Sequence, residues 1–79
     1  MEKVKTLADL AVGECGIIEG LITVGGMRRR FLDVGLSRGT PVRCVGESPF
    51  GDPRAYVVRG CKIAIRRIDA ETVAVRESN

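Results

Sequence analysis

The stretch RAYVVRGCKIAIR at residues 54–66 decides the fold of this chain. Its first half is rich in residues that favour β-strands, and its second half alternates, with Cys61, Ile63 and Ile65 on one face. Gly60 separates the two halves and tolerates the positive φ angle of a tight turn. The stretch therefore predicts an antiparallel hairpin with one face turned towards a core.

Further strand patterns lie on both sides of this hairpin. Predicted strands occupy residues 15–24, with a bend at Gly20, residues 41–45 and residues 72–75. Five short strands and ten glycines predict a mainly β fold, because closing a small barrel removes exposed edges and needs tightly curved backbone. We expect a small barrel of about five strands, with an open α+β sheet as the alternative.

One short α-helix is predicted over residues 27–34. Met27, Phe31 and Val34 recur at intervals of four and three residues, which places them on one stripe of a helix. Gly35 follows at once and fits the position just after a helix end. Residues 6–10 and 69–71 predict single helical turns. Such short helices need a sheet to pack on.

Composition limits the functions that the chain can have. Its 79 residues predict one domain over residues 1–79, and the absence of histidine excludes Ser-His-Asp and Cys-His catalysis. The longest uncharged stretch, Gly20–Met27, is far too short to cross a bilayer and lacks the lysine of a phosphate-binding loop. No long apolar segment marks the N-terminus. We expect a cytoplasmic protein that is not an enzyme and has no cofactor.

Charge is spread unevenly along the sequence. Residues 27–67 carry a net charge of +7, whereas the segments before and after each carry −2. A basic middle indicates an acidic partner. The run Arg28-Arg29-Arg30 starts the predicted helix, where cations oppose the helix dipole, and one explanation is a carboxylate or phosphate on a partner. Alternatively, Arg30 lies along the barrel and forms a local ion pair.

Two other features allow a structural or a functional interpretation. Cys15, Cys44 and Cys61 form no CxxC pair, so burial as small apolar side chains is favoured over a metal-thiolate site. Phe50 lies between Pro49 and Gly51 in a loop that joins two strands. Its ring is presented there as a binding anchor, or it folds back over the barrel end, which is favoured because a small core needs its aromatics.

The assembled pattern resembles the FeoA family over nearly the whole chain. The residues that carry the resemblance are RRFLDVGL at 29–36, Gly39-Thr40, PFGDP at 49–53, Val58-Arg59-Gly60, IAIR at 63–66 and the segment from Ala70 to Val75. Phe31, Phe50 and Ile65 replace the leucine that is more usual there. The resemblance implies an SH3-like barrel and a cytoplasmic accessory role in bacterial ferrous iron uptake. It implies no catalytic residues.

The resemblance also implies a partner, the FeoB membrane transporter with its cytoplasmic GTPase domain. The same domain type forms the C-terminal module of DtxR-like metal-dependent repressors, but this chain has no room for a helix-turn-helix. We expect partner binding through Arg28, Arg29, Arg30, Leu36 and Phe50. The alternatives are a nucleic-acid-binding module and a weak transition-metal sensor using cysteines and carboxylates. Metal-binding residues and a homodimer stay open.

Overall fold

The structure is a computed structural model, and it describes residues 5–77. The elements in chain order are a 3₁₀ turn η1 (Leu7–Asp9), β1 (Cys15–Leu21), α1 (Gly25–Asp33), β2 (Pro41–Glu47), β3 (Arg54–Val58), β4 (Cys61–Ile65), α2 (Arg67–Ala70) and β5 (Val73–Glu77). The predicted five strands and short helix are confirmed. The first strand ends three residues earlier than predicted, and α1 starts two residues earlier.

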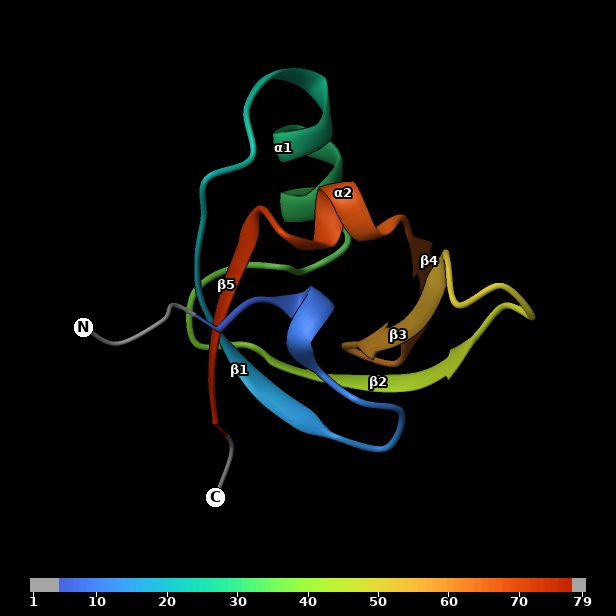
Figure 1. The fold of residues 1–79 in the computed structure, drawn as a ribbon. Coiled ribbons are helices and arrows are strands. Elements are labelled where there is room, and N and C mark those ends of the chain that lie inside the picture. The colour runs from blue at the N-terminus through green and yellow to red at the C-terminus, as the bar shows by residue number, and fades with distance from the viewer. Residues whose placement is uncertain (1–4, 78–79) are drawn as a thin grey trace.

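The five strands form one antiparallel sheet in the order β4-β3-β2-β1-β5. The pairing register shifts between Ile18 and Gly20 in β1 and between Cys44 and Gly46 in β2. Such bulges bend a strand and increase its twist. Figure 1 accordingly shows a strongly curved sheet, with α1 and α2 together at one end of it. The sequence did predict the bend at Gly20.

The hairpin of β3 and β4 forms as predicted. Its pairs run from Val58 with Cys61 to Arg54 with Ile65. Arg59 and Gly60 make the turn with φ angles of 51° and 77°, the left-handed values of a type I′ turn. The positive φ was expected for glycine, whereas Arg59 adopts it without being glycine.

The core lies inside the curved sheet. It consists of Leu7, Leu10, Ile18, Phe31, Leu36, Val42, Cys44, Tyr56, Val58, Ile65, Ala70, Val73 and Val75. The expectation of three buried cysteines is wrong, because Cys15 and Cys61 are exposed and only Cys44 is buried. Cys61 alternates in step with Ile63 and Ile65, but it follows the hairpin turn directly and is exposed there.

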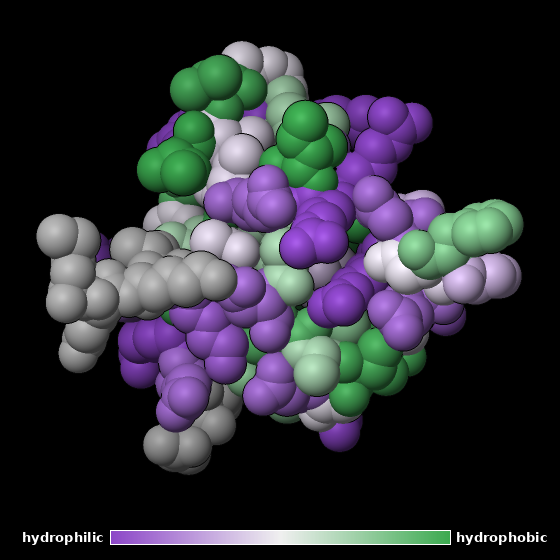
Figure 2. Space-filling view, in the orientation of Figure 1, coloured by the Kyte–Doolittle hydropathy of each residue, from purple (hydrophilic) through white to green (hydrophobic). Residues whose placement is uncertain are grey.

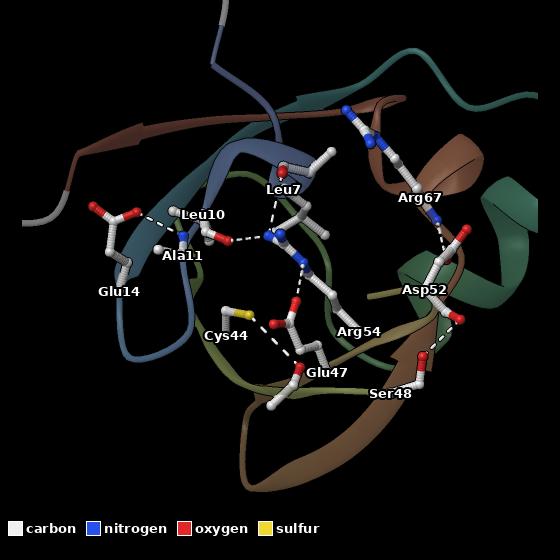
Figure 3. A network of polar contacts seen from close by, with 12 residues as sticks. Leu7, Leu10, Ala11, Glu14, Cys44, Glu47, Ser48, Asp52, Arg54 and Arg67 are labelled. Atoms are coloured by element: carbon white, nitrogen blue, oxygen red, sulfur yellow. Dashed lines mark hydrogen bonds and ion pairs between the residues drawn. The ribbon is translucent and has the colours of Figure 1, made fainter. Parts of the chain in front are cut away.

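The N-terminal turn η1 is tied to β3 by side chains (Figure 3). The Arg54 guanidinium donates to the Leu10 carbonyl oxygen at 2.6 Å and lies 3.4 Å from a Glu47 carboxylate oxygen. The Tyr56 hydroxyl donates to the carbonyl oxygen of Leu7 at 3.1 Å. Tyr56 is fully buried, and this burial raises its pKa to about 12, since the phenolate would lose its hydration. The η1 turn is therefore part of the core.

Candidate partner-binding surface

The C-terminus of α1 decides the place of one predicted binding residue, Leu36. The Leu36 amide donates to the Phe31 carbonyl at 2.9 Å, and the Gly35 amide donates to the Leu32 carbonyl at 3.1 Å. This pair of bonds is a Schellman motif, with Gly35 at a φ of 106°. The motif turns Leu36 back onto Phe31, so Leu36 is fully buried. Its prediction as a partner contact is wrong, and Leu36 is a core residue.

The three predicted arginines are all exposed on α1. Because α1 begins at Gly25, they lie in its middle and last turn, so the expected conflict with the N-terminal dipole does not arise. Arg28 donates to the Leu21 carbonyl at 3.1 Å and is therefore partly engaged in holding α1. Within residues 5–77, the side chains of Arg29 and Arg30 have no hydrogen bond or ion pair, so the local ion pair considered for Arg30 is absent.

A groove separates α1 from the sheet edge formed by β4. Its volume is about 340 Å³, and it is bounded on the third side by α2. The lining residues are Met27, Arg30, Phe31, Val34, Ile63, Ala64, Ile65, Arg66 and Asp69. The sequence pattern had marked the apolar stripe of α1 as a contact to the sheet. That contact covers the stripe only partly, since Met27 and Val34 remain half-buried beside open space.

Phe50 lies apart from the arginines. The β2–β3 loop that carries it projects away from α1 in Figure 1, and its ring is 95% exposed. The expectation that Phe50 folds back over the barrel is therefore wrong. Ser48 Oγ donates to the Asp52 carbonyl at 2.7 Å, and the Asp52 carboxylate accepts the Arg67 amide at 2.9 Å. These bonds, drawn in Figure 3, fix the loop and leave the ring outside.

Sequence reasoning missed other exposed apolar side chains. Ile22 and Val24, in the connection between β1 and α1, are 75% and 80% exposed, and Ile68 on α2 is 70% exposed. On the face drawn in Figure 2, hydrophobic surface occurs as separate patches with hydrophilic residues between them. The sequence does carry a signal for Ile22 and Val24, the uncharged stretch that contains them, but its pattern predicts the end of a strand.

Residues 5–77 form neither a metal cluster nor a membrane-spanning helix. No three His, Cys, Asp or Glu side chains come together there in a way that could hold a metal ion. No helix in this part of the chain is long and apolar enough to span a membrane. The structure thus offers a basic helix face and a groove as its distinctive surface features.

Comparison with known proteins identifies the family. The FeoA domain model matches residues 5–77. The FeoA protein of Chlorobium tepidum is 28% identical, with a TM-score of 0.89 over 95% of this chain and 71% of its own. The Stenotrophomonas maltophilia FeoA, solved with zinc, is 27% identical, with a TM-score of 0.80 over 90% of this chain and 88% of its own. That protein is described as a prokaryotic SH3 domain protein and a suggested activating factor for ferrous iron transport.

The fold extends to repressors as well. A manganese-dependent transcriptional repressor superposes with a TM-score of 0.83 over 99% of this chain, which spans 38% of that chain. At 16% identity this likeness shows the shared fold alone. A comparison with curated protein sequences gave no match. The five-stranded SH3-like fold and the match over residues 5–77 together place this chain in the FeoA family.

Proposed function

We propose that this FeoA-domain protein is a non-enzymatic accessory of ferrous iron uptake that binds the cytoplasmic part of an FeoB-type transporter. The observation that carries the proposal is the unpaired state of Arg29 and Arg30, which no other group within residues 5–77 neutralises. Such cations can steer and orient a partner that carries carboxylates. Family membership and the transport role suggested for the Stenotrophomonas relative support the choice of an iron transporter.

The chemistry of the chain supports an accessory role. A nucleophile needs a base beside it, and the sequence has no histidine. In the described part of the chain, the exposed Cys15 and Cys61 make no hydrogen bond to any side chain that could act as a base. The proposal therefore assigns this protein the task of binding a partner and modulating the partner's activity.

Nucleic acid is the weaker candidate partner. Proteins that bind single strands combine basic residues with exposed aromatic rings on which bases stack. Phe31 and Tyr56 are buried, so Phe50 is the one exposed aromatic ring within residues 5–77, and it lies away from the arginines of α1. Charge alone therefore supports nucleic-acid binding, whereas the ring placement does not.

The test is a binding titration with the purified cytoplasmic GTPase part of the transporter. We expect saturable binding by the wild type and at least a tenfold loss, about 1.4 kcal/mol, in Arg29→Glu/Arg30→Glu. The matched control is Arg38→Glu/Arg43→Glu, which makes the same charge change at two other exposed arginines without an ion pair inside the described range, and should stay within about twofold. No binding by the wild type would contradict the proposal, and equal losses in both variants would reject the α1 site.

A further inference from the structure

Strand β4 is an open edge of the sheet. It stands last in the strand order, and within residues 5–77 no other strand pairs with its outer side. The opposite edge, β5, is partly covered, because Thr6 forms a bridge with Ala74 and the Val75 amide donates to the Lys5 carbonyl at 2.8 Å. An uncovered strand edge is a template for pairing with another chain.

The hairpin register identifies the backbone groups at this edge. A two-residue turn makes its flanking residues, Val58 and Cys61, a hydrogen-bonded pair, and such pairs alternate along an antiparallel ladder. The amides and carbonyls of Cys61, Ile63 and Ile65 therefore face β3. Those of Lys62 and Ala64 face outward, and in the described part of the chain neither residue has another backbone partner.

The groove between α1, β4 and α2 lies along the same edge, since Ile63, Ala64 and Ile65 are among its lining residues. Its apolar lining on the helix side comes from Met27, Phe31 and Val34 of α1. Two lining arginines, Arg30 and Arg66, have no ion pair within residues 5–77, and Lys62 is a further cation on strand β4. Asp69 is the one carboxylate among the groove residues. The charge at this edge thus favours an acidic occupant.

We propose that an acidic, extended segment of a partner protein adds to β4 as a sixth strand. Its backbone bonds to Lys62 and Ala64, its apolar side chains enter the groove, and its carboxylates meet Arg30 and Arg66. The inference rests on the proposed function only for the choice of the transporter as partner. A second copy of this chain is a poor occupant, because β4 against β4 would bring Lys62 and Arg66 of both copies together.

The test screens a random display library of 12-residue peptides against the immobilised full-length chain. We expect enriched peptides in which Asp or Glu alternates with Val, Ile or Thr. A synthetic copy of one selected peptide is then titrated into three proteins by calorimetry: wild type, Ala64→Pro and Ala64→Val. Proline at an edge position removes one outward amide and is tolerated by the strand, whereas valine keeps the amide.

We expect Ala64→Pro to weaken peptide binding at least tenfold and Ala64→Val to change it less than threefold. Thermal melting checks that both variants are folded, and Arg66→Glu, expected to lose about fivefold, gives a second variant that leaves the backbone intact. Peptide binding should also slow hydrogen exchange at the Lys62 and Ala64 amides. No acidic consensus, or equal binding by folded Ala64→Pro and wild type, would overturn the inference.

The same variants separate this inference from the proposed function. If the transporter part binds wild type and Ala64→Pro equally while acidic peptides discriminate between them, strand addition is real and the transporter uses another face. If acidic peptides bind β4 but the transporter part does not bind, the strand site stands and the transporter assignment fails. If neither the transporter part nor the acidic peptides distinguish wild type from Ala64→Pro, the β4 site is rejected.

Discussion

Two helical segments pack on the same curved sheet and are held to it very differently. η1 spans three residues, yet Leu7 and Leu10 are fully buried and the carbonyls of both accept hydrogen bonds from β3 side chains. α1 spans nine residues, and Phe31 is its one buried residue. The difference indicates that the shorter segment stabilises the fold, whereas the longer one mainly presents side chains to the outside. Binding surfaces are commonly drawn from such weakly held elements.

The largest expected effect comes from shortening one leucine in each segment. Leu7→Ala should lower the free energy of unfolding by about 2–5 kcal/mol, because it leaves a cavity under η1. Leu32→Ala, at a side chain 42% exposed on α1, should change it by about 0.5 kcal/mol or less. Urea unfolding of both variants measures the difference. Similar losses of stability in the two variants would contradict the contrast between η1 and α1.

Alkaline pH should lower the free energy of unfolding through Tyr56, the β3 residue that bonds to η1. Tyr56 has a folded pKa of about 12 against 10 when unfolded, so the unfolded chain loses its phenol proton first as pH rises. The contribution is complete below pH 10 and is lost between pH 10 and 12, where stability falls by about 2–3 kcal/mol. Urea unfolding at pH 8, 10 and 11.5 follows this loss.

Tyr56→Phe serves as the control for that titration. It lacks the bond to the Leu7 carbonyl, so at pH 8 it should be about 1 kcal/mol less stable than wild type. It also lacks the phenol, so the gap should close and then reverse as pH rises towards 12. A gap that stays constant with pH would show that Tyr56 does not titrate as its burial requires.

Two glycines of the α1 region give a smaller pair of effects with opposite signs. Gly35→Ala should destabilise by about 1–2 kcal/mol, because Gly35 has a φ of 106° and a Cβ would lie 2.5 Å from Cδ of Arg59. Gly26→Ala should stabilise by about 0.5–1 kcal/mol, since Gly26 is helical and a Cβ there meets nothing within 4 Å. Thermal unfolding of both variants checks the signs. A destabilising Gly26→Ala would mean that α1 needs its flexible start.

Much of the fold could be predicted because its signals are local. Alternation in residues 61–65 indicated a strand, the turn at Gly60 indicated a hairpin, and Gly35 marked the helix end. The prediction that all three cysteines are buried was wrong for a physical reason. Alternation tells which face of a strand a residue lies on, but burial depends on what packs against that face, and Cys61 is exposed at the hairpin turn.

The candidate site was less predictable because it depends on the assembled sheet. Leu36 could be placed inside only by the paired bonds of the Schellman motif, and Phe50 outside only by the hydrogen bonds that hold its loop. That β4 is an edge follows from the strand order, which no local pattern encodes. The exposed arginines were found because a run of like charge is visible in the sequence itself.

The last contrast compares arginines from the two regions. Arg54→Met should cost about 1.5–3 kcal/mol, since it leaves the Leu10 carbonyl and Glu47 without their partner. Arg29→Glu/Arg30→Glu should change the free energy of unfolding by about 0.5 kcal/mol or less, because both side chains are exposed and bond to nothing within residues 5–77. Urea unfolding of the two variants measures this contrast. A large loss in the α1 pair would mean that the fold uses these arginines, and their assignment to a partner would lose its basis.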